Sequence, residues 1–173
     1  MPDLIRILLA EDNANDAELT LAALGEQNLA GGVDVVRDGT EALDYLYRRG
    51  TWSARGPEQP CVVVLDIKMP KLGGLEVLRT IKADAALKTL PVVMLTSSRE
   101  EGDMLKSYQF GVNAYVVKPV DFGQFSMAVR QLGLFWVEIN EPPPLSLRAQ
   151  RKAPPGYENA RPHPPPRGQP GGW

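Results

Sequence analysis

The 173-residue sequence has one cysteine and one histidine. The single cysteine, Cys61, excludes an intramolecular disulfide and favours a reducing compartment. The single histidine, His163, leaves little material for a zinc site or for catalysis by a serine or cysteine paired with histidine. No apolar run approaches the roughly 20 residues that a membrane helix needs, and the apolar start of the chain is too short and too charged for a signal peptide. We therefore expect a cytoplasmic protein that does not enter a membrane.

Proline is abundant but unevenly distributed. Ten of the 16 prolines lie in residues 141–173, together with seven apolar, five basic and two acidic residues. Proline-rich segments favour polyproline II structure and cannot build a core. The net charge of −2 argues against a chain built to bind nucleic acid or an anionic membrane. The sequence predicts one domain over residues 1–140 and a disordered or arm-like extension over residues 141–173, with no room for a DNA-binding domain.

Five short apolar runs alternate with segments of helical periodicity. The runs predict strands at residues 5–10, 33–37, 61–66, 91–95 and 114–117. Apolar residues spaced by three or four predict five helices, the first capped by Asn13 and the fourth ended by Gly111. This alternation predicts an α/β fold, a doubly wound five-stranded parallel sheet of the flavodoxin-like order 2-1-3-4-5 with helices on both faces. Residues 50–60 are longer than a usual connection and are predicted to be a loop insertion.

Polar residues stand at the carboxyl ends of four of these strands. Glu11 and Asp12 follow the first strand, Asp66 ends the third, Thr96 follows the fourth and Lys118 follows the fifth. Ligands of doubly wound sheets bind at this edge. Three neighbouring carboxylates repel one another unless a cation neutralises them, and oxygen ligands suit Mg²⁺. The sequence therefore predicts a magnesium site at this edge.

The motifs around these residues resemble the receiver domain of response regulators, the phosphorylatable module of bacterial two-component signalling. They occupy residues 7–13, 64–70, 73–74, 94–97 and 118–119. The resemblance covers about residues 4–135, and the separations of 30 residues from Asp66 to Thr96 and 52 residues to Lys118 fit the family. It implies that Asp66 accepts a phosphoryl group from the phosphohistidine of a sensor kinase. A protein of this kind is a phosphoacceptor and not a turnover enzyme.

The resemblance also implies the other members of the site. Glu11, Asp12 and Asp66 would hold Mg²⁺ together with the backbone carbonyl of Lys68. Lys118 would pair with the phosphoryl oxygens.

The resemblance implies roles for three further residues, one that positions Lys118 and two that respond to phosphorylation. Pro119 is expected to follow a cis peptide bond that aims Lys118. On phosphorylation, the Thr96 hydroxyl would move toward the phosphoryl group and Tyr115 would turn inward.

Two features extend beyond a minimal receiver domain. The insertion at residues 50–60 and the apolar stretch that begins at residue 134 resemble the stand-alone regulators paired with phytochrome-type light-sensing kinases. The stretch contains four residues too apolar to leave in water, which either close the core or form an interface: Phe135, Trp136, Val137 and Ile139. We favour a homodimer, with output through dimer state or protein partners.

Three alternatives remain open. The first is a magnesium-dependent phosphatase with an aspartate nucleophile, but such enzymes usually carry a second aspartate where this chain has Lys68. The second is a receiver-like protein that binds partners and is never phosphorylated, which the complete set of site residues disfavours. The third is flavin binding, but no phosphate-binding loop follows the first strand.

Overall fold

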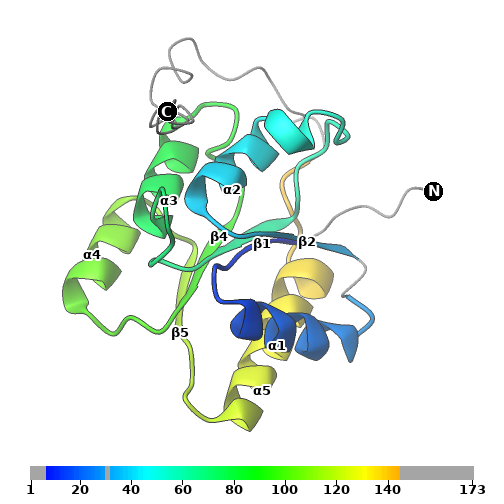
Figure 1. Cartoon of the computed structure of the whole chain (residues 1–173), viewed down its shortest axis with the longest axis vertical. Coiled ribbons are helices and arrows are strands. Elements are labelled where there is room, and N and C mark those ends of the chain that lie inside the picture. The colour runs from blue at the N-terminus through cyan, green and yellow to red at the C-terminus, as the bar shows by residue number, and fades with distance from the viewer. Residues whose placement is uncertain (1–6, 30–31, 145–173) are drawn as a thin grey trace, which may run out of the picture.

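Five parallel strands form one sheet in the computed structural model, which describes residues 7–29 and 32–144 (Figure 1). The strands are β1 (Ile7–Ala10), β2 (Val33–Val36), β3 (Val62–Leu65), β4 (Val92–Thr96) and β5 (Ala114–Val117). Their spatial order is β2-β1-β3-β4-β5, with every neighbouring pair parallel. The predicted fold class and strand order are confirmed.

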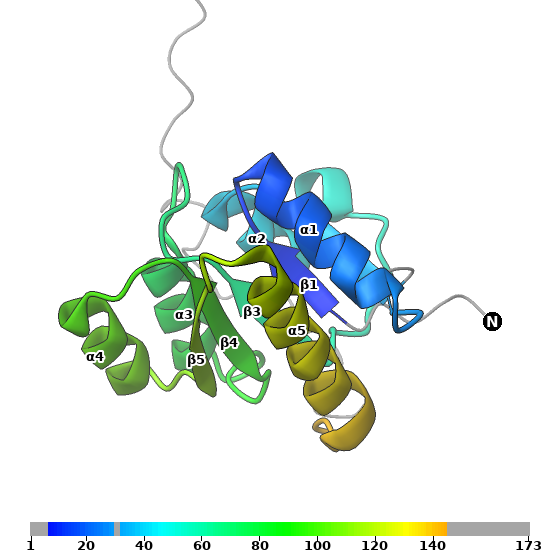
Figure 2. The ribbon, with the colours of Figure 1, turned by 90° about the horizontal axis from the view of Figure 1, so that it is seen from below.

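Helices cover both faces of this sheet. Figures 1 and 2 show α1 and α5 side by side on one face, and α2, α3 and α4 on the other. The helices are α1 (Ala14–Gly25), α2 (Gly39–Leu46), α3 (Gly74–Ala83), α4 (Glu101–Gln109) and α5 (Phe122–Gly133). Successive side chains of a strand point to opposite faces, so Leu8 packs under α2 and α3 while Ile7 and Leu9 pack under α1 and α5. The central strands are consequently buried on both sides, as their continuous apolar runs predict.

Short polar residues cap the amino ends of α1 and α5. The Asn13 side chain accepts a hydrogen bond from the Asp16 backbone N–H, as predicted, and Asp121 accepts one from Gln124. These bonds satisfy backbone donors that a first turn leaves unpaired. At the other end of a helix, Gly111 follows α4 with a φ of 94°, the left-handed conformation that a glycine adopts at low cost.

The start of α3 lies directly against the end of β3. A Cβ atom on Gly74 would stand 2.0 Å from the Asp66 carbonyl oxygen, which is closer than any side chain allows. The Gly74 N–H donates to the Ile67 carbonyl at 2.8 Å. Glycine at this position therefore lets α3 approach and fixes the loop that carries Asp66.

The insertion at residues 50–60 is a packed segment that begins with a short 3₁₀-helix, η2 (Gly50–Trp52). The Arg55 guanidinium lies 4.1 Å from the centre of the Tyr45 ring and donates to the Tyr45 carbonyl. The buried Gln59 amide donates to the Leu46 carbonyl at 2.9 Å. The insertion thus closes the carboxyl end of α2.

The chain leaves α5 in a wider turn, the π-helix η3 (Leu134–Ile139). The Asn140 N–H donates to the Phe135 carbonyl, five residues back. The predicted fifth helix, which was to continue through Trp136 with ordinary helical spacing, is wrong beyond Gly133. Val137 is buried in this turn and packs against α1 and α5.

Candidate functional site

Asp66 stands at the carboxyl end of β3, with 10% of its side chain exposed. Its Oδ1 accepts a hydrogen bond from the Ile67 N–H at 2.7 Å. Its Oδ2 lies 3.1 Å from the ammonium nitrogen of Lys118. One carboxylate oxygen is thus held by the backbone, and the other lies beside a cation.

Glu11 and Asp12 follow β1, the neighbouring strand, and bring two more carboxylates to the same edge. Oxygen atoms of Glu11, Asp12 and Asp66 all lie within 4.8 Å of one another. Glu11 and Asp66 are buried, whereas Asp12 is exposed. Three clustered carboxylates, one of them open to solvent, form a donor set that suits a hard divalent cation. The predicted metal-binding carboxylates are therefore together, and the group fits Mg²⁺.

Lys118 reaches these carboxylates from the end of β5. Its Nζ lies 2.6 Å from Glu11 Oε2 and 2.9 Å from Asp16 Oδ2. Burial alone would lower the pKa of Lys118, but hydrogen bonds to Glu11 and Asp16 and the charge of Asp66 outweigh it and raise the pKa. Lys118 is consequently a buried ammonium that stays charged.

Glu11 is the most buried carboxylate of the group. Its Oε1 accepts a hydrogen bond from the Asn13 N–H at 3.0 Å, and its Oε2 accepts one from Lys118. Burial raises the pKa of Glu11 to about 7, against the opposing effect of Lys118. The charge of this group therefore changes near neutral pH in the metal-free protein.

Asp16 is a site residue that the sequence analysis missed. The sequence analysis predicted only the helix that Asn13 caps, whereas the Asp16 side chain in the first turn of that helix pairs with Lys118. The signal was present, because a helix that starts right after Asp12 must place its first turn beside the site. Spacing alone could not show which side of that turn faces Lys118.

The peptide bond before Pro119 is trans, since no cis bond occurs in residues 7–29 or 32–144. The expectation of a cis bond is wrong. The Lys118 N–H donates to the Thr96 carbonyl at 2.8 Å, and its side chain still reaches three carboxylates. Lys118 is thus aimed by the end of β5 without a cis bond.

Thr96 and Tyr115 are connected through Ser98. Thr96 is buried, and its Oγ1 accepts a hydrogen bond from the Ser98 N–H at 3.2 Å. The half-buried Tyr115 donates its hydroxyl to the Ser98 carbonyl at 3.0 Å. The Ser98 hydroxyl in turn donates to Asp103 in α4. The two predicted switch residues therefore bind one short loop between β4 and α4.

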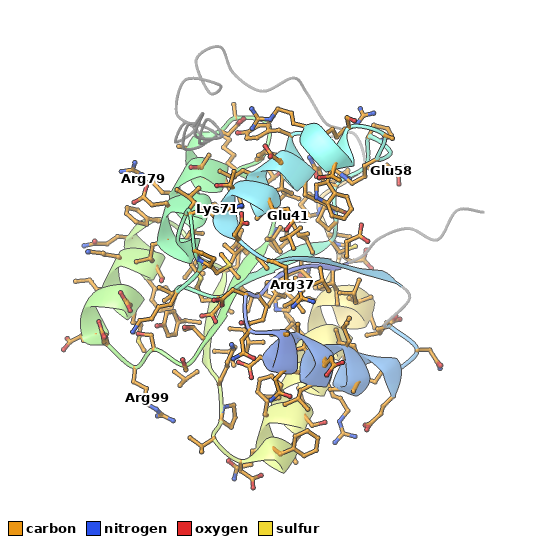
Figure 3. All side chains as sticks on the ribbon, in the orientation of Figure 1. Arg37, Glu41, Glu58, Lys71, Arg79 and Arg99 are labelled. Atoms are coloured by element: carbon orange, nitrogen blue, oxygen red, sulfur yellow. The ribbon has the colours of Figure 1, made fainter. Side chains whose placement is uncertain are left out.

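Lys68 and its neighbours form the polar border of the site. The Lys68 ammonium is exposed and lies 3.8 Å from Glu100. Lys71 pairs with Asp38 at 3.3 Å, which joins the loop after β3 to the start of α2. In Figure 3, Lys71 lies close to α2, while Arg99 projects outward from the molecule.

The four apolar residues after α5 divide into two groups. Val137 is buried in the core against α1 and α5, and Trp136 packs partly against the same cluster. Phe135 is 46% exposed and Ile139 is 60% exposed.

The tail beyond residue 144, including His163, lies outside the described residues. Among the helices of residues 7–29 and 32–144, none is long and apolar enough to cross a membrane.

Comparison with known proteins identifies the family. The model of the response regulator receiver domain matches residues 7–130. The response regulator Rcp1 of Synechocystis sp. is 34% identical over 76% of this chain and 88% of its own length. The FilR2 protein of Methanothrix harundinacea, described as a probable methanogenesis regulatory protein, is 36% identical over 79% of this chain and 86% of its own length.

Two solved structures are also similar. The bacteriophytochrome response regulator AtBRR is 57% identical, with a TM-score of 0.64 over 81% of this chain and 100% of that chain. The phosphorylated cyanobacterial phytochrome response regulator RcpA is 36% identical, with a TM-score of 0.76 over 82% of this chain and 99% of that chain. This chain therefore belongs to the response regulator receiver domain family, the signalling proteins of two-component systems, and is related to the phytochrome response regulators.

Proposed function

We propose that this protein is a single-domain response regulator that accepts a phosphoryl group on Asp66 from a sensor histidine kinase. The observation that carries the proposal is the position of Lys118 Nζ, 3.1 Å from Asp66 Oδ2 and within a group of clustered carboxylates. A carboxylate nucleophile needs a positive charge beside the group that it receives, and Lys118 supplies one.

The transfer follows from this arrangement. An oxygen of Asp66 forms a bond to phosphorus while the bond from phosphorus to the histidine nitrogen of the kinase breaks, and the electron pair of that bond leaves with the nitrogen. Lys118 would pair with the phosphoryl oxygens. Glu11, Asp12, Asp66 and the Lys68 carbonyl would hold Mg²⁺, which when bound offsets negative charge on the transferred group. Water would later release the phosphoryl group, so each chain carries at most one at a time and turns over no other substrate.

The phosphoryl group would be read by Thr96 and Tyr115. It adds about −1.5 to −2 of charge and three acceptor oxygens. The Thr96 hydroxyl is buried near this edge and is engaged by Ser98, to which Tyr115 also bonds. A hydroxyl that turns toward the phosphoryl oxygens would therefore shift the loop between β4 and α4 together with Tyr115.

The partner that we propose is a phytochrome-type histidine kinase. The similarity to AtBRR and RcpA, which are described as phytochrome response regulators, supports this choice. For output we propose a homodimer whose interface includes Phe135 and Ile139, because both are exposed on η3. Trp136 and Val137 would support that surface from the inside.

The test is labelling with acetyl phosphate and Mg²⁺, followed by intact mass. Wild-type protein is expected to gain one phosphoryl group, and Asp66→Asn is expected to gain none because the amide is not a nucleophile. Asp44→Asn is the matched control and should leave labelling unchanged, since Asp44 of α2 pairs with Arg49, which follows that helix. Labelling of the Asp66→Asn protein to the wild-type level would overturn the proposal.

A further inference from the structure

Asp16 contacts the site from outside the group of carboxylates that could hold a metal. Its Oδ2 lies 2.9 Å from Lys118 Nζ, and 32% of its side chain is exposed. The clustered oxygens belong to Glu11, Asp12 and Asp66, and Asp16 is not one of that group. A cation bound to the clustered carboxylates would therefore not use Asp16, and Asp16 could still pair with Lys118.

The first turn of α1 fixes the position of Asp16. Its backbone N–H donates to the Asn13 side chain at 3.0 Å, and its carbonyl accepts a hydrogen bond from the Thr20 hydroxyl at 2.7 Å. A residue whose backbone is held at both groups has few directions for a short side chain. The Asp16 carboxylate consequently lies beside Lys118 without help from the metal ligands.

Glu11 and Asp66, the other two partners of Lys118, would also bind the metal ion. Glu11 Oε2 and Asp66 Oδ2 lie 2.6 Å and 3.1 Å from Nζ, and both residues belong to the cluster. A divalent cation that enters must compete with the ammonium for these oxygens. An ammonium with no other partner would compete strongly, because a buried unpaired charge is costly. A third carboxylate outside the cluster lowers that cost.

We infer that Asp16 is a positioning residue that holds the Lys118 ammonium at the side of the site, so that Glu11 and Asp66 can bind a divalent cation. The inference rests on the proposed function, since it concerns the metal on which phosphorylation would depend. Loss of the Asp16 charge is expected to weaken cation binding through two effects of the same sign. It leaves Lys118 with only the metal-binding carboxylates Glu11 and Asp66 as partners, and it removes attraction for the cation.

The experiment is calorimetric titration of the metal-free full chain with Mn²⁺ alone, without any phosphodonor. Asp16→Asn is expected to weaken binding about fivefold, within the range of coupling energies between contacting residues. Glu18→Gln, which removes the same charge from an exposed position of α1, is expected to change binding less than about twofold. Asp16→Glu, which keeps a carboxylate, should bind nearly as well as wild type.

A second background separates positioning from long-range attraction. In a Lys118→Ala protein, Asp16→Asn is expected to change Mn²⁺ binding less than about twofold, because there is no ammonium left to hold. An equal loss in both backgrounds, or no loss in either, would overturn the role of Asp16. Wild-type protein that fails to bind Mn²⁺ would overturn the metal site of the proposed function as well. Thermal unfolding of each metal-free variant verifies that it is folded.

Discussion

Glu11 shows how burial and pairing act on one side chain in opposite directions. Its two oxygens accept hydrogen bonds from Asn13 and Lys118, and only 3% of the residue is exposed. The desolvation of the charged form is the larger effect, and it raises the pKa of Glu11 to about 7. The folded metal-free protein therefore binds a proton at Glu11 more tightly than the unfolded chain does.

This difference predicts a pH dependence of stability. Between the ordinary pKa of 4.5 and about 7, the folded state holds more protons at Glu11 than the unfolded state. The stability contributed by this group is thus complete below pH 4.5 and is lost as the pH rises through 7. In urea unfolding with a chelator, the free energy of unfolding of wild type minus that of Glu11→Gln should fall by up to about 3 kcal/mol over that window. A difference that stays constant with pH would contradict the shift.

Asp16 is the site residue that could not be predicted from the sequence. Carboxylates at strand ends could be predicted to gather, because parallel strands end at one edge. The helical side chain that joins them depends on the rotation of α1 relative to β5, and these elements are about one hundred residues apart in the chain. No local sequence pattern predicts the rotation of α1 relative to β5.

At the scale of elements, the junction of β3 and α3 holds the residue that is proposed to react. The close approach of Gly74 to the Asp66 carbonyl leaves no space for a methyl group. We predict that Gly74→Ala lowers the free energy of unfolding by about 2–4 kcal/mol, because α3 must move away from Asp66. The measurement is urea denaturation.

The control for this prediction is a glycine in open space. Nothing lies within 4 Å of a Cβ on Gly102 in α4, so Gly102→Ala should raise stability by up to about 1 kcal/mol through helix propensity. If Gly74→Ala were as stable as wild type, the close packing of α3 against Asp66 would be contradicted.

The elements were predictable where their signals are local. Apolar runs predicted all five strands to within two residues among the described positions, and Asn13 predicted the start of α1. The end of α5 was not predictable, because apolar spacing cannot distinguish hydrogen bonds to the fourth residue from those to the fifth. The end of the helix lies close against α1, since a Cβ on Gly133 would meet Leu24 at 2.6 Å, and such a contact between distant residues cannot be read from local spacing.

At the scale of the whole molecule, the six residues of η3 include both buried and exposed apolar side chains. Val137 is buried between α1 and α5, so its contribution is to the fold of its own chain. Phe135 and Ile139 lie on the same turn but are exposed. A truncation before this turn would open the core, and its effect on assembly would be mixed with an effect on folding. Substitutions of exposed residues separate the two roles.

We therefore predict that Phe135→Ser with Ile139→Ser converts a dimer of the full chain to a monomer, with little change in stability. Each serine removes apolar surface that is exposed in the single chain and that a partner would bury. Light scattering coupled to size exclusion measures the mass, and Leu105→Ser is the control, since Leu105 is 57% exposed on α4. A wild-type monomer would contradict the proposed homodimer. A dimer that is lost with Leu105→Ser and kept in the double variant would place the interface on α4 instead.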